Sequence, residues 1–281
     1  MVLPRGSDAV SPTAHYTGYV WVRNDLSHPQ LATLEGRLFY DALRPAMAAS
    51  RLLGGPTLEA MLLARHRIID ALLAEAIERG RVGQVIEIAC GMSPRGWRFA
   101  NRFGDRIVYV EADLPDMAAR KRRALDRMGG RGDHHRVEEL DALRDRGAGS
   151  LAEVASTLDR RRGLAVVTEG LLAYFGSGDV RDMWRRFARE LGRFRSGLYL
   201  ADLHVGSAGR DVTARAFQTA LSAYVRRLVH VHFDDEEAAA ASLRRAGFTE
   251  ADLHRGDRHE AAGDAVGDPA AARIHVLEAW T

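Results

Sequence analysis

Four short apolar runs, each followed by a helical stretch, constrain the fold of this chain most strongly. They cover residues 84–89, 106–111, 164–169 and 197–202, and each ends in an acidic or a small residue. The runs are continuous rather than alternating, which is typical of strands buried on both faces. Helical stretches lie between these runs, at 94–102, 115–128, 151–160 and 178–192. This alternation predicts an α/β fold with a doubly wound, mostly parallel sheet.

Further elements flank this alternating region. Helices are expected at 29–53 and 57–78, the second with Thr57 as its N-cap. A helix at 234–246 precedes strands at 248–253 and 273–280, which suggests a hairpin with an antiparallel last strand. We therefore expect one globular unit, with a tail and helical cap at 1–80 and a core at 81–281. Residues 203–233 form an insertion that is a candidate substrate lid.

The composition limits the cell compartment and the classes of binding partner that we expect. Cys90 is the only cysteine, so no intrachain disulfide can form, and a cytoplasmic location is expected. No stretch approaches the roughly 20 apolar residues of a membrane span, so no membrane partner is expected. The formal net charge is +2, which does not call for nucleic acid. The basic runs at 120–123 and 160–162 are interpreted as solvated helix faces.

A strand–turn–helix unit at residues 87–96 carries the first chemical signal. Ala89 and Gly91 are small, which lets a ligand approach the backbone where the helix begins with free N–H groups. Glu111 ends the next run, 20 residues after Gly91, where an acidic side chain can accept the hydroxyls of a ribose. Each feature alone also fits an ordinary turn or a surface glutamate; together they favour nucleoside binding. The turn lacks the glycines of a pyrophosphate loop, which favours S-adenosylmethionine over NAD.

Three segments together resemble a known family. They are residues 85–96, residues 110–115 followed by Lys121, and residues 167–174 with the sequence Val-Thr-Glu-Gly-Leu-Leu-Ala-Tyr. They resemble the leucine carboxyl methyltransferases, a family that includes polyketide O-methyltransferases similar to the tetracenomycin carboxyl methyltransferase. The resemblance extends over roughly residues 15–280. It implies a Rossmann-like class I methyltransferase fold with seven strands and extra N-terminal helices, with S-adenosylmethionine as cofactor.

The resemblance also implies roles for individual residues. Glu111 would bind the ribose, Asp141 the adenine amino group, and Arg65 the cofactor carboxylate, with Arg67 or a plain surface arginine as alternatives for the last role. The cofactor-binding set is Arg65, Glu87, Ala89, Gly91, Glu111, Ala112, Asp141, Ala142, Glu169 and Gly170.

The acceptor decides whether a base is needed. A carboxylate is already ionised at pH 7, whereas a hydroxyl benefits from a general base. Tyr174 and His204 are the candidate catalytic residues, and either could instead be structural. The other candidate bases, each equally open to a structural role, are His134, His135, His230 and His232. No metal is expected, because Asp113 and Asp116 lack a third ligand at a fixed spacing.

The expected function is O-methylation of a small molecule, such as a polyketide-like metabolite. Methylation of a protein C-terminal carboxylate and silent nucleoside binding are alternatives. An NAD-dependent reductase would need a Tyr-x-x-x-Lys pair, and Lys121 has no tyrosine four residues before it. The aromatic segment 16–21 would either cover the ligand or staple the N-terminus to the sheet. A homodimer is left open.

Overall fold

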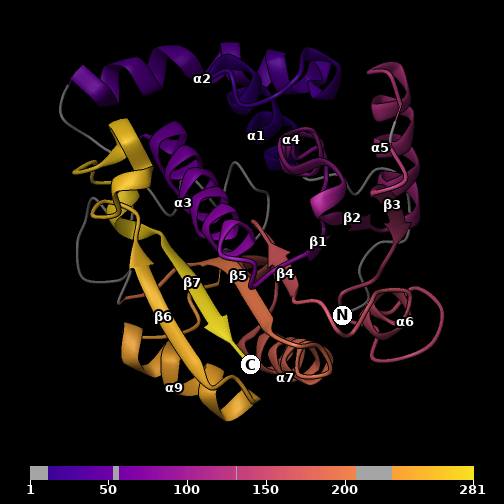
Figure 1. Cartoon of the computed structure of the whole chain (residues 1–281). Coiled ribbons are helices and arrows are strands. Elements are labelled where there is room, and N and C mark those ends of the chain that lie inside the picture. Colours follow the sequence, from indigo (N-terminus) through magenta and orange to yellow (C-terminus); the bar gives the residue numbers. More distant parts are fainter. Residues whose placement is uncertain (1–11, 53–56, 131, 207–229) are drawn as a thin grey trace.

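The computed structural model describes residues 12–52, 57–130, 132–206 and 230–281. A seven-stranded sheet in the order β3-β2-β1-β4-β5-β7-β6 forms its centre (Figure 1). The first five strands in this order pair in parallel, and β7 is antiparallel to both of its neighbours. This is the expected class I methyltransferase topology. The strands are β1 (Gln84–Ile88), β2 (Val108–Asp113), β3 (His135–Glu139), β4 (Leu164–Thr168), β5 (Gly197–Leu203), β6 (Glu250–Arg255) and β7 (His275–Trp280).

Helices cover both faces of the sheet (Figure 1). On one face lie α1 (Pro12–Arg23), α2 (Leu34–Leu52), α3 (Leu58–Glu78), α4 (Arg95–Phe103) and α5 (Pro115–Arg127). On the other lie α6 (Leu151–Ser156), α7 (Ser177–Leu191) and α9 (Glu236–Ala246). Each face has its own apolar core, and all five residues of β1 are buried between them. Burial on both faces explains why the strands read as continuous apolar runs.

Local signals set several helix ends. The Thr57 hydroxyl accepts a hydrogen bond from the Ala60 N–H at 3.2 Å, which caps α3 as expected. Asp235 caps α9 in the same way, through the Ala238 N–H at 2.7 Å. Gly247, with φ of 117°, ends α9 in the left-handed conformation that glycine adopts freely.

Several boundaries differ from the sequence expectation, among them the following three. The helix expected at 29–53 is divided into the short 3₁₀ turn η2 (Pro29–Leu31) and α2. Strand β2 ends at Asp113, two residues beyond the expected end. Strand β3 was not found as an apolar run, because Val137 is its only aliphatic residue.

The aromatic N-terminal segment lies in α1 and packs against the core. Tyr16 and Trp21 are buried, and the Trp21 ring lies 4.7 Å from the His66 ring of α3, measured between centroids. This packing of the aromatic segment therefore holds α1 against α3. The lid expected at 203–233 has its residues 207–229 outside the described part of the chain; its ends are joined by a bridge between Val205 and Phe233.

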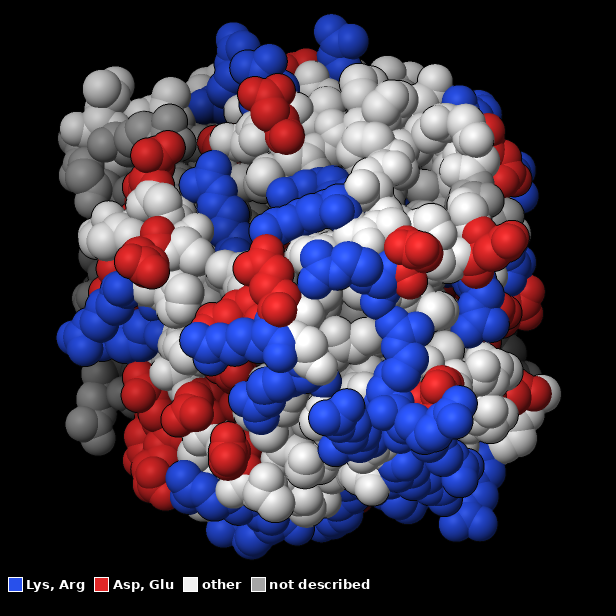
Figure 2. Space-filling model, in the orientation of Figure 1, with Lys and Arg blue, Asp and Glu red and all other residues white. Residues whose placement is uncertain are grey.

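The charges on the face drawn in Figure 2 are mixed, and part of this face is rich in arginine. Figure 2 shows arginine side chains gathered at the lower right of the drawn face, where Figure 1 has α6 and α7. Exposed arginines of α7 include Arg185 and Arg189, which pair with Asp182 at 2.5 Å and Asp145 at 2.6 Å. These pairs fit a solvated helix face. Among the described residues, no helix combines the length and the apolar character needed to cross a bilayer.

Candidate active site

The carboxyl ends of five parallel strands meet at one edge of the sheet. Open α/β sheets bind ligands at this edge, where the strand order reverses. Here the reversal lies between β1 and β4. Along the edge, in the order β3, β2, β1, β4, β5, the chain presents Asp141, Asp113, Gly91, Glu169 and Asp202. The polar groups thus form a line that crosses the switch point.

The turn after β1 is open and bounded by small residues. Ala89 and Gly91 have φ angles of 54° and 51°, and a Cβ added at Gly91 would meet nothing within 4 Å. The Gly91 N–H donates to Asp113 Oδ2 at 2.7 Å, and Asp113 Oδ1 accepts from the Leu114 N–H at 2.8 Å. Asp113 therefore ties the end of β2 to the turn and stands half-buried at the edge.

Glu111 lies elsewhere than expected. It is fully buried inside β2, where its Oε2 lies 3.2 Å from Lys121 Nζ and 3.7 Å from His135 Nε2. Although burial opposes ionisation, Lys121 and His135 hold the pKa of Glu111 below its usual range. Gly96 of α4 covers the carboxylate so closely that a Cβ there would overlap it. Because β2 continues for two more residues, Asp113 occupies the edge position that was expected for Glu111.

A buried ion cluster lies beneath the edge, between the sheet and helices α3 and α4. Its centre is Arg95, which has no exposed surface and donates to Asp70 at 2.6 Å, Glu87 at 2.7 Å and Glu169 at 2.6 Å. His66 Nδ1 lies 2.9 Å from Glu169 Oε2. The Tyr109 hydroxyl donates to the second Glu87 oxygen at 2.8 Å. The cluster comprises Arg65, His66, Asp70, Glu87, Arg95, Glu169 and Asp202.

Arg65 links this cluster to the edge. Its Nε donates to Glu169 at 3.1 Å and its Nη1 donates to Asp202 at 3.0 Å. Asp202 also accepts from the Gly170 N–H at 2.6 Å, and Gly170 has a φ of 71°. The remaining guanidinium nitrogen, Nη2, lies 3.2 Å from the position that a Cβ would take at Gly170. Arg67, the alternative considered from the sequence, instead donates to the Ala262 carbonyl at 3.2 Å.

The cluster keeps two of its acids, Glu169 and Asp70, ionised despite their burial. Burial raises the pKa of Glu169, but His66, Arg95 and Arg65 outweigh that effect and hold it far below its usual range. Likewise, His66, Arg95 and Arg98 outweigh burial and lower the pKa of Asp70. Glu169 is therefore a fixed negative charge at the end of β4.

The residues after β3 continue the line. The Asp141 carboxylate accepts from the Leu143 N–H at 2.9 Å, and the Leu140 N–H donates to the Asp113 carbonyl at 2.8 Å. These bonds hold the β3 end beside the β2 end. Ala142 is half-buried at this edge and packs against the apolar core on the α7 face of the sheet, the same core in which the Ala112 side chain is fully buried.

Tyr174 and His204 lie at the β4 and β5 end of the edge. Tyr174 belongs to the 3₁₀ turn η4 (Leu172–Tyr174), which follows β4. His204 directly follows β5, with Nδ1 3.3 Å from the Arg273 carbonyl. His134 and His135 lie instead at the start of β3, on the opposite edge. Within the described residues, no three His, Cys, Asp or Glu side chains are grouped to hold a metal ion.

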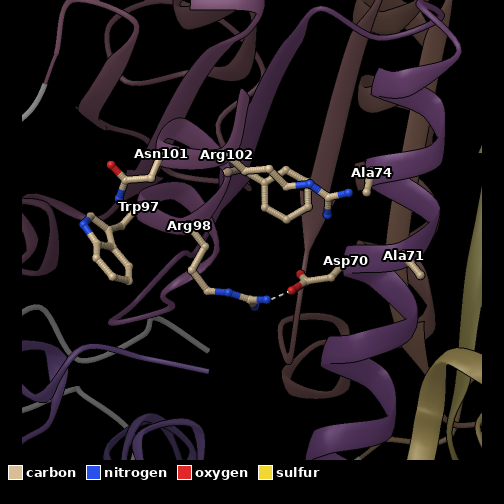
Figure 3. Close-up of a pocket in the computed structure, with 8 residues that line it drawn as sticks. Asp70, Ala71, Ala74, Trp97, Arg98, Asn101 and Arg102 are labelled. Atoms are coloured by element: carbon tan, nitrogen blue, oxygen red, sulfur yellow. Dashed lines mark hydrogen bonds and ion pairs between the residues drawn. The ribbon is translucent and has the colours of Figure 1, made fainter. Parts of the chain in front are cut away.

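A cavity of about 500 Å³ lies away from this edge, between α3 and α4 (Figure 3). Its wall includes Asp70 and Arg98, whose side chains pair at 2.6 Å, together with Trp97 and Arg102 from α4. The cavity therefore flanks the buried ion cluster and does not include the carboxyl ends of the strands.

Sequence reasoning missed the residues that support the site. Asp70, Arg95 and Asp202 are present in the sequence, and Asp202 ends one of the strand runs. Their ion pairs join residues far apart in the chain, and no local sequence pattern signals such pairs. Asp113 lies two residues after Glu111 in the Glu-Ala-Asp segment and was considered from the sequence only as a metal ligand.

Solved structures share this fold. A Thermobifida fusca protein assigned as a methyltransferase is 12% identical, with 99% of this chain and 98% of that chain covered and a TM-score of 0.67. A DUF574 family protein from Streptomyces avermitilis is 13% identical, with 95% and 96% covered and a TM-score of 0.63. Other matched structures are longer: this chain spans 51% of PigF bound to SAH and 66% of a Bordetella parapertussis protein.

Sequence comparison identifies the family. No curated protein sequence matches the chain significantly. The model of the leucine carboxyl methyltransferase family matches residues 27–188, which is more than half of the 281 residues and includes β1, β2, β3 and β4. The chain belongs to the leucine carboxyl methyltransferase family.

Proposed function

We propose that the chain transfers a methyl group from S-adenosylmethionine to an oxygen atom of a small molecule, such as a polyketide-like metabolite. The observation that carries this proposal is the order of polar groups along the carboxyl edge. Asp141, Asp113, Gly91 and Glu169 follow one another on four neighbouring strands, with Arg65 beside the last. An extended molecule with a base, a sugar and an amino acid matches this order.

The nucleoside half would lie over β3 and β2. Asp141 would accept from the adenine amino group, as the family resemblance implies. Asp113 would accept from the ribose hydroxyls, because its carboxylate is half-buried at the edge while that of Glu111 is enclosed beneath α4. Its two oxygens each accept one backbone N–H and retain further lone pairs for hydroxyl donors.

The amino-acid half would lie over β1 and β4. Its ammonium and carboxylate groups need a negative and a positive partner. Glu169 and Arg65 supply that pair, with their side chains 3.1 Å apart. Gly91 leaves open space above the turn. The Arg65 guanidinium suits the cofactor carboxylate, because the two groups form a charge-assisted pair. The donor set therefore fits the cofactor.

The protein's contribution to the reaction would be alignment. The bound sulfonium supplies an activated methyl group with a neutral thioether as leaving group. Proximity and orientation can lower such a barrier by at most roughly 7–11 kcal/mol. Tyr174 and His204, at the ends of β4 and β5, would contact the acceptor next to the methionine half.

Calorimetry with S-adenosylhomocysteine tests this proposal on the full chain. Arg65→Lys keeps the charge but loses the guanidinium fork, so we expect binding to weaken by roughly tenfold. Arg67→Lys makes the same change on the same helix at a residue bound to Ala262, and should leave the affinity unaltered. Absence of S-adenosylhomocysteine binding, or equal effects of the two changes, would refute the assignment of the site.

Radiolabelled S-adenosylmethionine tests transfer itself. Incubation with a panel of phenols and carboxylic acids should label at least one acceptor. Binding of S-adenosylhomocysteine without any transfer would favour a silent nucleoside-binding protein instead.

A further inference from the structure

One residue of the segments that resemble the family is explained neither by the strand ends nor by the buried ion cluster. Lys121 is the only lysine among the 40 basic residues of the chain. It lies in the middle of α5 and has no exposed surface. Lysine is almost never fully buried unless its charge is paired. A chain that uses arginine at every other basic position therefore keeps a lysine at the one place where the cation is enclosed near the site.

The partners of the Lys121 ammonium group come from two segments. Its Nζ donates to the Ser93 carbonyl at 2.5 Å and to the Gly91 carbonyl at 3.5 Å. Its third partner is Glu111 of β2, whose Oε2 lies 3.2 Å away in an ion pair. The ammonium group thus joins α5 to the turn after β1 and to the neighbouring strand.

The turn after β1 is held on two sides. The Gly91 N–H donates to Asp113 at 2.7 Å, and the Ser93 N–H donates to the Cys90 carbonyl at 2.9 Å. These bonds fix the N–H groups, while Lys121 binds the carbonyl groups of the same two residues. Since Lys121 is enclosed, the carbonyl of buried Ser93 is directed into the protein and not towards the edge of the sheet.

Glu111 keeps the ammonium group charged and in place. Burial lowers the pKa of Lys121, but the neighbouring acidic groups, Glu111 first, outweigh that effect and raise it above its usual value. The Glu111 carboxylate cannot move towards α4, because a Cβ added at Gly96 would lie only 2.1 Å from its Oε1. The start of α4 therefore packs directly against the acid that pairs with Lys121.

The arrangement suits lysine and not arginine. Two carbonyl oxygens and one carboxylate oxygen converge on a single nitrogen atom. A compact ammonium group with three donors fits such a set, whereas the flat guanidinium fork of arginine fits two parallel oxygens. The geometry thus accounts for the one lysine of the chain.

We propose that Lys121 is a positioning residue of the methyl-transfer site, which fixes the turn after β1 in the shape that receives the methionine half of the cofactor. This inference rests on the proposed function. Lys121 acts through the backbone of Gly91 and Ser93, and Glu111 holds it in place. A turn that is fixed before the cofactor arrives does not have to be ordered on binding, and this saving in entropy strengthens the complex.

Two variants separate positioning from stability. Glu111→Gln leaves the charge of Lys121 buried without a counterion, and adding Lys121→Met removes that charge. We therefore expect the added change to raise the urea midpoint relative to Glu111→Gln alone. We also expect it to weaken S-adenosylhomocysteine binding in calorimetry by roughly 10–100-fold, because the turn loses its two hydrogen bonds to the ammonium group.

The opposite directions of these two effects distinguish positioning from a purely structural role, which would move midpoint and affinity together. An unaltered affinity, or an affinity that falls only with a falling midpoint, would overturn the proposal. If the wild type itself does not bind S-adenosylhomocysteine, the proposed function fails and this inference fails with it. Normal binding by the wild type with either contrary result refutes this inference alone.

Arg122→Met, also added to Glu111→Gln, is the matched control. Arg122 is the next residue of α5, and its Nε donates to the Val137 carbonyl of β3 at 3.1 Å. The change removes a cation and its bond to a carbonyl from the same helix without touching the turn. It should leave the affinity as it is in Glu111→Gln, and a loss equal to that caused by Lys121→Met would overturn the proposal.

NMR of the side-chain nitrogen tests the buried ammonium group without any reaction. Because the chain has one lysine, labelling with ¹⁵N-lysine gives one side-chain signal that needs no assignment. We expect an ammonium group whose hydrogens exchange slowly with water at pH 7, and a signal that shifts when S-adenosylhomocysteine is added to the full chain. Rapid exchange, or a signal that saturating S-adenosylhomocysteine leaves unchanged, would contradict the assignment.

Discussion

Replacing Arg95 by glutamine should reduce stability by about 3–5 kcal/mol. Arg95 is fully buried and contacts Asp70, Glu87 and Glu169. Removing one partner of a buried ion pair costs about this amount, because a charge is left uncompensated. The loss should not be three times larger. Asp70 keeps Arg98 and Glu169 keeps Arg65, so only Glu87 loses its cation and retains the Tyr109 hydroxyl.

The loss should depend on pH. The pKa values of Asp70 and Glu169 lie below their usual range in the folded wild type, so these acids stabilise it above about pH 4.5 and lose that effect as the pH falls through the folded values. Without Arg95 the folded values rise towards the unfolded ones. The variant can then protonate its acids as the pH falls, and the difference from wild type should be largest at pH 7 and smaller at pH 4.

Urea unfolding followed by tryptophan fluorescence at both pH values measures the difference. Arg102→Gln is the matched control on the same helix. Arg102 pairs with Glu78 in an exposed contact, with 57% and 52% of the two side chains accessible, and should cost about 0–1 kcal/mol. A loss below about 1 kcal/mol for Arg95→Gln at pH 7, or one that does not change with pH, would refute the view that this arginine compensates the buried acids.

Four further predictions concern the edge, its support and helix α1. Asp113→Asn should weaken S-adenosylhomocysteine binding roughly tenfold in calorimetry. Glu111→Gln should mainly destabilise the fold, by about 3–5 kcal/mol, because it leaves the charge of Lys121 unpaired. The reverse pattern would assign the ribose to Glu111. Gly91→Ala should cost only about 1–2 kcal/mol for its left-handed φ, because the space is open. Gly96→Ala should cost more in chemical denaturation, because its Cβ overlaps the Glu111 carboxylate, and a smaller loss would contradict that packing. Trp21→Ala should lower the free energy of unfolding by about 3–5 kcal/mol in the same assay. An unchanged denaturation midpoint would show that Trp21 does not hold α1 against α3.

Much of the fold was predictable because the signals are local. Four strands follow from apolar runs that burial on both faces requires, and the Thr57 cap follows from one side chain at a helix start. Strand β3 was hidden because it lies at the edge of the sheet and carries Arg136, Glu138 and Glu139 with a single aliphatic residue. Its existence followed only from family resemblance.

The position of the site at the strand ends was predictable from the sequence, but the buried ion pairs beneath it were not. The motif residues lie at strand ends, so their approximate position follows from the topology. The pairings of Arg95 with Asp70 and Glu169 join positions 25 and 74 residues apart. Nothing in the local sequence specifies such contacts, since any of 40 basic and 38 acidic residues could have paired.

The assignment of the sugar-binding acid depends on where one strand ends. Side chains alternate along a strand, so Glu111 and Asp113 share a face of the sheet. The outer one stands at the edge, while the inner one lies under α4 and needs Lys121 as a counterion. A strand that ended two residues earlier would place Glu111 at the edge without changing the face. A sequence motif with acids two residues apart therefore identifies the face that binds a ligand, and only the length of β2 decides which carboxylate the ligand can reach.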